Sequence, residues 1–140
     1  MNACIVDASV VAAAFFREDV SAGARRLLSS GCELHAPDLV YAEVANVIWK
    51  RQNRREIDDA EARELLSDVL RLPLRITPGD SLAEAALTLA MRADRSVYDC
   101  LYLALAVQRK SVMVTGDKRL VNALAETPLK KHVAWIGQIR

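Results

Sequence analysis

Four acidic residues interrupt or closely follow the most apolar stretches of this chain, and their placement limits the folds that it can adopt. They are Asp7, Glu43, Asp99 and Asp117. Asp7 ends the apolar run of residues 3–6, and Asp99 lies inside residues 97–106. Carboxylates avoid apolar surroundings unless they are paired or bound to a metal ion, because desolvation of the charge is costly. The pattern therefore predicts a fold that gathers these side chains into one polar site.

The composition fits one globular domain that spans residues 1–140. Of the 140 residues, 52% are hydrophobic, which is enough to bury a core of ordinary size. The formal net charge is only +1, so overall basicity is excluded as a basis for nucleic-acid binding. Any such surface must be a local patch.

The cysteines and the N-terminus indicate a cytoplasmic protein. Cys4, Cys32 and Cys100 stand far apart and form no C-x-x-C pair, a pattern that fits reducing conditions. Asp7 breaks the apolar N-terminus and no cationic segment precedes it, which argues against a secretory signal. No stretch reaches the roughly 18 apolar residues needed to cross a bilayer, so we expect no membrane association.

Apolar runs and turn residues predict alternating strands and helices. Strands are expected at 3–6, 33–36, 74–77, 112–114 and 133–136, and helices at 10–16, 22–29, 37–51, 58–70, 80–91, from 96 onward, and 120–125. Pro37 is expected at the first position of its helix, where the missing N–H costs nothing. This alternation indicates an α/β fold with a central, mostly parallel sheet of about five short strands flanked by helices.

The same topology is expected to bring the four acids together. The turns after parallel strands meet at one edge of the sheet, so Asp7 and Asp117 should approach each other there. Helical spacing places Glu43 and Asp99 among apolar neighbours, so both should face inward. Two strand-end acids and two helical acids then form one cluster.

Each acid except Glu43 also has a structural explanation. Asp7 or Ser9 is suited to cap the first helix, and Asp117 is suited to cap the last. The segment from Ser96 to Asp99 matches a capping box. Glu43 lies in mid-helix, where no cap is needed, and the combination therefore favours a site.

Electrostatics favours a metal ion in that site. Two carboxylates about 4 Å apart repel by roughly 4 kcal/mol at an effective dielectric constant near 20. Protonation or a divalent cation relieves the repulsion, and an all-oxygen set with water suits Mg²⁺ or Mn²⁺. His35 and His132 lie in no zinc-binding pattern, and structural roles are expected for both.

Several segments together resemble the PIN-domain ribonucleases, most closely the VapC-type toxins of bacterial toxin–antitoxin pairs. The resemblance spans nearly the whole chain and is carried by residues 5–9, 37–39, 42–46, 98–106 and 114–120. It implies a three-layer PIN-like fold with Asp7 and Asp99 as the principal metal ligands. Glu43 and Asp117 would complete the acidic site directly or through water, and Thr115 would assist.

The resemblance also implies an activity and partners. PIN-domain ribonucleases cut RNA to leave a 5′-phosphate and a 3′-hydroxyl, so we expect a Mg²⁺- or Mn²⁺-dependent endoribonuclease. VapC-like proteins pair with a small antitoxin that covers the acidic groove, and they commonly form homodimers. We expect the antitoxin to lay a helix in an apolar groove near Val10, Val11, Phe15 and Phe16.

Candidate RNA contacts are weaker in the sequence. Lys118 and Arg119 adjoin Asp117 and are expected to hold phosphates, and Ser9 either caps its helix or contacts a phosphate. The basic segment 49–55 either contacts phosphates or is a solvated helix end, and the second explanation is favoured. The aromatic residues Tyr41, Trp49, Tyr98 and Tyr102 are suited to stack on exposed bases, but a place in the core or in a dimer contact is favoured for them.

Two other readings remain open at this point. A response-regulator receiver also gathers acids, a Thr and a Lys around Mg²⁺, but it needs an Asp directly after a middle strand. Here residues 74–77 run into Pro78 and Gly79, and Asp99 lies in a helix. The second reading is a noncatalytic domain whose acids bind a structural cation or a basic peptide.

Overall fold

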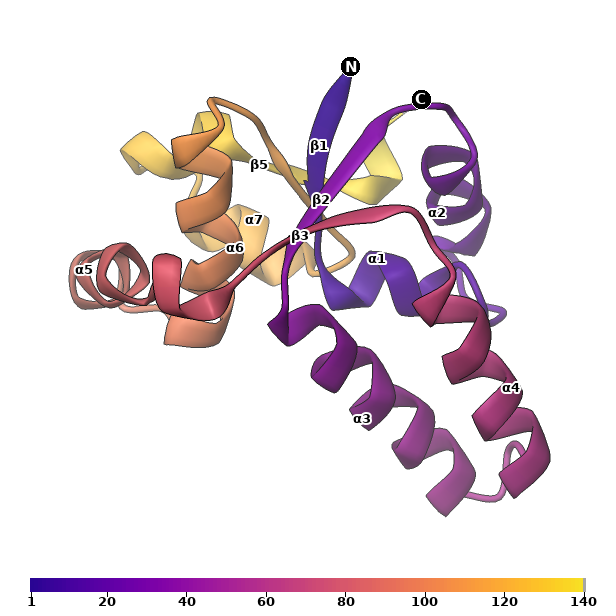
Figure 1. Ribbon diagram of the computed structural model, residues 1–140. Coiled ribbons are helices and arrows are strands. Elements are labelled where there is room, and N and C mark those ends of the chain that lie inside the picture. The colour runs from indigo at the N-terminus through magenta and orange to yellow at the C-terminus, as the bar shows by residue number, and fades with distance from the viewer. Residues whose placement is uncertain (140) are drawn as a thin grey trace.

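Five parallel strands form the centre of the protein, as the computed structural model of residues 1–139 shows (Figure 1). The strands are β1 (Ala3–Val6), β2 (Glu33–Pro37), β3 (Leu74–Thr77), β4 (Met113–Thr115) and β5 (Val133–Trp135). Their order across the sheet is β3-β2-β1-β4-β5, and every neighbouring pair is parallel. The predicted α/β class and the strand count are confirmed.

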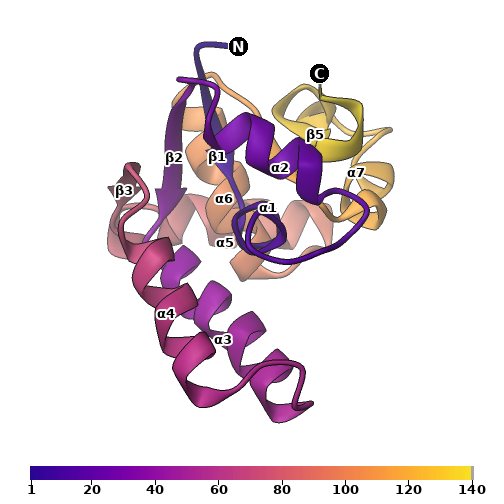
Figure 2. The ribbon, with the colours of Figure 1, turned by 90° about the vertical axis from the view of Figure 1, so that its right-hand side faces the viewer.

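Helices cover both faces of this sheet. They are α1 (Ala8–Ala13), α2 (Ser21–Leu28), α3 (Leu39–Asn53), α4 (Asp59–Leu70), α5 (Ala83–Ala93), α6 (Val97–Gln108) and α7 (Lys118–Ala123). In Figure 1, α5, α6 and α7 lie to the left of the sheet and α1 and α2 to the right, with α3 and α4 projecting below them. The view turned by 90° shows α3 and α4 side by side (Figure 2). The fold is therefore the three-layer arrangement that the sequence predicts.

The direction of the chain reverses at β1. From β1 it moves outward through β2 to β3, and it then crosses to the other side of β1 to add β4 and β5. Open α/β sheets have a crevice at such a reversal, outside the carboxyl ends of the two strands involved. The crevice between the ends of β1 and β4 is therefore where a site is expected.

Helix α6 anchors one face of the core. Its apolar run contacts β1, β2 and β4, and six of its residues are buried. A helix that is apolar on nearly all sides is stable only when other elements surround it. Here α5 packs along its outer side, and the first two turns, which carry Asp99 and Tyr102, face the crevice.

Several predicted element boundaries differ from the structure. Pro37 is the last residue of β2 rather than the first of a helix, and α3 begins at Leu39 after Asp38. At a strand end the missing N–H of proline breaks no interior ladder bond, which explains its place. Helix α1 ends at Ala13 rather than Phe16.

None of the helices within residues 1–139 is long and apolar enough to cross a membrane.

We expect Leu103→Ala to lower the free energy of unfolding by about 2–5 kcal/mol, because Leu103 in α6 is fully buried and the change leaves a cavity. Val107→Ala, one turn further along the same helix, is the control. Val107 is 40% exposed, and its truncation should cost within about 0.5 kcal/mol. Urea denaturation followed by circular dichroism measures both. Equal losses would show that α6 is not held by its buried face.

Candidate active site

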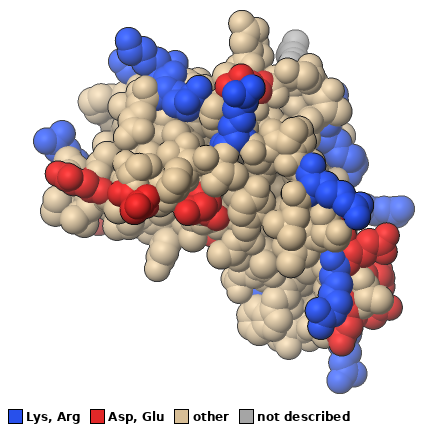
Figure 3. Space-filling model, viewed as in Figure 1, with Lys and Arg blue, Asp and Glu red and all other residues tan. Residues whose placement is uncertain are grey.

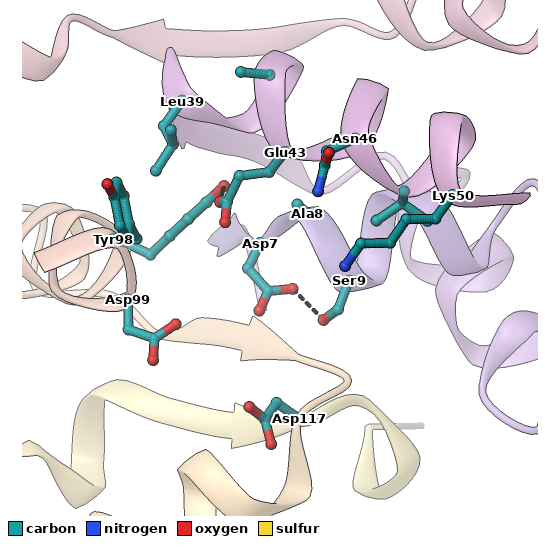
Figure 4. A pocket seen from close by; sticks show the side chains of 13 residues that line it. Asp7, Ala8, Ser9, Leu39, Glu43, Asn46, Lys50, Tyr98, Asp99 and Asp117 are labelled. Atoms are coloured by element: carbon teal, nitrogen blue, oxygen red, sulfur yellow. Dashed lines mark hydrogen bonds between the residues drawn. The ribbon is translucent and has the colours of Figure 1, made fainter. Parts of the chain in front are cut away.

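A pocket of about 500 Å³ opens at the reversal point of the sheet. Its walls come from the ends of β1 and β4 and from helices α1, α3 and α6. All four sequence-predicted acids line it, namely Asp7, Glu43, Asp99 and Asp117. Figure 4 shows them arriving from separate elements around a common space. The predicted gathering of acids from distant parts of the chain is thus present.

Asp7 is the most constrained of these acids. It follows β1 and caps α1, since its Oδ1 accepts from the backbone N–H of Val10 at 3.1 Å. The same oxygen accepts from the hydroxyl of Ser9 at 2.5 Å, and Oδ2 accepts from the hydroxyl of Thr115 at 2.6 Å. Asp7 is only 8% exposed and Thr115 is fully buried. Both carboxylate oxygens therefore have fixed directions.

Ser9 joins the ends of β1 and β4. Its hydroxyl donates to Asp7 and accepts from the backbone N–H of Gly116 at 2.8 Å. A side chain at Gly116 would place its Cβ 3.2 Å from that hydroxyl oxygen, so glycine permits the close approach. The prediction that Ser9 caps the helix is wrong, because Asp7 supplies the cap and Ser9 supports it.

A buried tyrosine orients Glu43. The hydroxyl of Tyr102 in α6 donates to Oε1 of Glu43 in α3 at 2.6 Å. Burial raises the pKa of Tyr102, so the group stays protonated and acts as a donor. The inward direction predicted for Glu43 is confirmed by this bond. No local sequence pattern identifies Tyr102 as the partner, since the two residues are 59 positions apart.

Asp99 and Asp117 both lie at the N-terminal ends of helices. Asp99 lies in the first turn of α6, where its N–H donates to the hydroxyl of Ser96. Asp117 caps α7 by accepting from the N–H of Leu120 at 3.2 Å, as one of the structural explanations predicted. Capping uses only one oxygen of Asp117. The other oxygen remains available to the pocket.

Burial disfavours the ionised form of Asp7 in the absence of a cation. Desolvation raises the pKa of Asp7 from 3.8 to about 6, although hydrogen bonds from Ser9 and Thr115 oppose the rise. Repulsion from the Glu43 carboxylate adds to it. A carboxyl that titrates near pH 6 is only partly stabilised as an anion by its own surroundings.

The helical acids show the same effect. Burial raises the pKa of Glu43; the bond from Tyr102 opposes the rise and the charge of Asp99 adds to it. Burial likewise raises the pKa of Asp99, which the positive charge of Arg95 opposes and the charge of Asp117 reinforces. The negative charge of a neighbouring acid thus adds to the rise in the pKa of both Glu43 and Asp99. Perturbed carboxyls in a crevice are a common property of functional sites.

The donor set suits a hard divalent cation held partly through water. Within residues 1–139, no three acidic, histidine or cysteine side chains lie close enough to ligate one ion together as they stand. Magnesium is commonly bound through one or two carboxylates with several waters retained, so a closed cage is not required. The pocket offers carboxylate oxygens only from Asp7, Glu43, Asp99 and Asp117, together with room for water.

The structure adds Asn46 to the residues that the sequence singles out, and it separates the other candidate RNA contacts. Asn46, Lys50 and Tyr98 line the pocket, whereas Lys118 and Arg119 do not. The ammonium group of Lys118 instead lies 4.7 Å above the ring of Trp135. A helical spacing of three and seven residues from Glu43 is the signal that points to Asn46 and Lys50.

Within residues 1–139, the side chains of the predicted apolar groove beside α1 pack against the core instead. Val10 and Val11 are fully buried and Phe16 is 8% exposed, so these side chains belong to the core. Phe15 is partly buried and packs against the same core, so the four side chains contribute to the fold rather than to an open groove. The prediction of that groove is wrong.

Comparison with known proteins now fixes the family. The chain matches the PIN domain family over residues 4–125. Ribonuclease VapC3 of Pyrobaculum aerophilum is 34% identical over 118 residues, which cover 83% of this chain and 90% of the relative. Ribonuclease VapC9 of Mycobacterium tuberculosis is 34% identical over 116 residues, covering 83% and 87%. The chain is a VapC-type PIN domain.

Solved structures share the fold of this PIN domain. The crystal structure of PAE2754 from Pyrobaculum aerophilum aligns with a TM-score of 0.72 at 23% identity, over 95% of this chain and 83% of that chain. A toxin–antitoxin complex from Klebsiella pneumoniae aligns with a TM-score of 0.64 at 16% identity, over 97% and 99%. Because the chain belongs to the PIN family, the alternative of a response-regulator receiver domain is excluded.

We expect Asp7→Asn to stabilise this PIN domain at pH 8 without divalent metal, by about 2–3 kcal/mol. The folded-state pKa of Asp7, about 6, lies above its ordinary 3.8, so ionisation destabilises the fold above pH 6. That penalty disappears as the pH falls towards 4, and the difference between the two proteins should shrink accordingly. Asparagine keeps an acceptor for Ser9 and Val10.

Thermal denaturation in EDTA between pH 4 and pH 8 measures this difference. Asp19→Asn, at an exposed position outside the pocket, is the control and should follow the wild type at every pH. A lower stability of Asp7→Asn at pH 8 would show that the hydrogen bonds of the carboxylate outweigh the cost of burying its charge.

Proposed function

We propose that this PIN domain is a Mg²⁺- or Mn²⁺-dependent endoribonuclease and the toxin of a toxin–antitoxin pair. The observation that carries the proposal is the pocket shared by Asp7, Glu43, Asp99 and Asp117 at the reversal point of the sheet. The ribonuclease names of its relatives support the reaction class. The all-carboxylate donor set supports the choice of metal.

Some residues of the pocket present carboxylate oxygens, and others keep those oxygens in position. Asp7 presents carboxylate oxygens that Ser9, Val10 and Thr115 keep in place, and these bonds limit its rotation. Such fixed acceptors need little reorganisation when a charged group arrives. A bound Mg²⁺ or Mn²⁺ lowers the pKa of a water and offsets charge on the phosphate and the leaving oxygen.

The remaining acids complete the same arrangement. Glu43, with its direction set by Tyr102, is placed to accept a proton from an attacking water or to hold a water of the metal shell. Asp99 and Asp117 face it from α6 and from the end of β4. We propose Asp7 and Asp99 as the principal ligands, with Glu43 and Asp117 acting directly or through water.

The proposal includes products and partners. Hydrolysis leaves a 5′-phosphate and a 3′-hydroxyl, as in the family that the chain belongs to. A small antitoxin binds the protein and covers the pocket, and the protein forms a homodimer. Exposed Leu87 and Met91 on α5 supply apolar surface outside the pocket for contacts of this kind.

The nuclease is tested by cleavage of end-labelled total RNA with purified protein in Mg²⁺, in Mn²⁺ and in EDTA. We expect discrete fragments only with metal, and a loss of at least about 100-fold in rate for Asp99→Asn, because the reaction depends on that carboxylate. Glu84→Gln, an exposed acid on α5, is the control and should cut like the wild type. Activity that survives EDTA would contradict the metal role.

The noncatalytic reading has a distinct outcome in the same experiment. Protein freed of antitoxin by denaturation and refolding, with a native circular dichroism spectrum, would cut no RNA under either metal. Metal would still raise its melting temperature. That combination would favour a structural cation over a catalytic one.

The partner is tested by coexpression with the product of the neighbouring open reading frame. We expect copurification, a complex whose mass by light scattering contains two copies of this chain, and suppression of RNA cleavage, because the antitoxin occupies the acidic pocket. A freely separating product, or a complex that cuts RNA at the rate of the isolated protein, would contradict the proposal.

A further inference from the structure

We propose that an RNA strand crosses the pocket between Lys50 and Tyr98, with one backbone phosphate on the Lys50 ammonium group and one unpaired base on the Tyr98 ring. Both side chains line the pocket together with the four acids. The inference rests on the proposed ribonuclease function and adds to it the two contacts that position the strand.

Lys50 is placed by the same helix that carries Glu43. The two residues are seven positions apart on α3, or two turns, so they share one face of the helix. The ammonium group extends toward the side of the pocket that holds Asp7 and Ser9 (Figure 4). No carboxylate of residues 1–139 forms an ion pair with it. A cation at the rim of an acidic site, with no anionic partner in this part of the chain, is suited to an incoming phosphate.

The structure separates Lys50 from the rest of its basic segment. Arg51 is bound to Glu18 at 2.5 Å and lies 4.1 Å above the ring of Phe16, so it ties the loop after α1 to α3. Arg54 and Arg55 lie at the end of the α3–α4 hairpin, where basic and acidic side chains intermingle (Figure 3). Lys50 is the one cation of the segment that lines the acidic pocket.

Tyr98 supplies an aromatic face at the other side of the pocket. Its side chain is 63% exposed, although it directly precedes Asp99 in the first turn of α6. Tyr102, one turn later, is buried and donates to Glu43, so the two tyrosines differ in role. An exposed ring beside a phosphate-binding site is suited to stack on a base, and such stacking is worth roughly 1–3 kcal/mol per base.

The two contacts lie on opposite sides of the acids. In Figure 4, Tyr98 and Lys50 flank Asp7 and Glu43. A strand that contacts both therefore passes its backbone over the carboxylates. A base inside a duplex is stacked on its neighbours and cannot lie on the ring, so this arrangement selects an unpaired segment.

The test measures binding rather than turnover. Every variant is made in an Asp99→Asn background, and affinity for a short fluorescein-labelled single-stranded RNA, and for its duplex, is measured by anisotropy in Mg²⁺ over a series of salt concentrations. We expect Tyr98→Leu to weaken single-strand binding about tenfold, with Tyr98→Phe unchanged and duplex binding unaffected. Lys50→Ala should lower the slope of log K against log salt by about 0.7.

Lys130→Ala is the matched control, because Lys130 is exposed and does not line the pocket. It should leave affinity and salt slope unchanged, and thermal melts should show that all variants fold. Affinities for Lys50→Ala and Tyr98→Leu that equal the parent value, or equal losses for Lys50→Ala and Lys130→Ala, would overturn the inference while leaving the nuclease intact.

Failure of the proposed function gives a different result. Cleavage by Asp99→Asn at the wild-type rate would contradict the catalytic site. RNA binding by the variants is then measured in EDTA, where the RNA is not cut. A roughly tenfold loss of affinity for Tyr98→Leu and a lower salt slope for Lys50→Ala would still show that Tyr98 and Lys50 contact the strand.

Discussion

The carboxylate of Asp7 is the contact on which the rest of the site depends. One oxygen accepts from the N–H of Val10 and the hydroxyl of Ser9, and the other accepts from the hydroxyl of Thr115. These bonds connect the end of β1, the start of α1 and the end of β4. A buried carboxyl that accepts these bonds holds the ends of β1 and β4 together at the crevice.

The cost of this arrangement is electrostatic, and the apolar core offsets it. The raised pKa values of Asp7, Glu43 and Asp99 each include repulsion from a neighbouring acid, and this repulsion would separate the acids if their elements were free to move. Helix α6 holds Asp99 in place because its buried face contacts three strands, and Tyr102 on the same helix restrains Glu43. Apolar burial thus supplies the rigidity with which like charges are kept together.

The sequence predicts those features that depend on local pattern. Alternating apolar runs predict the parallel sheet, and acids inside such runs predict the shared pocket that contains Asp7, Glu43, Asp99 and Asp117. The metal, the products and the site roles remain predictions. Helical period alone correctly indicates that Glu43 faces inward.

The sequence fails where the outcome depends on contacts between distant residues. Pro37 is predicted as a helix start, but its pairing with Thr77 of β3 places it at the end of a strand. Val10 and Val11 are predicted from the sequence to form a surface for a partner, whereas the fold buries both side chains. Lys50 lies in a basic run whose members are distinguished only by the direction of each side chain around α3.

The pairing of β4 with β1 also governs when the site can exist during synthesis of the protein. Residues up to 77 supply β1, β2 and β3, but the other edge of β1 stays open until Met113–Thr115 have been made. The bond from Thr115 to Asp7 joins residues 108 positions apart. A growing chain on the ribosome therefore lacks the assembled pocket until residues 113–117 have been made, long after β1 has been synthesised.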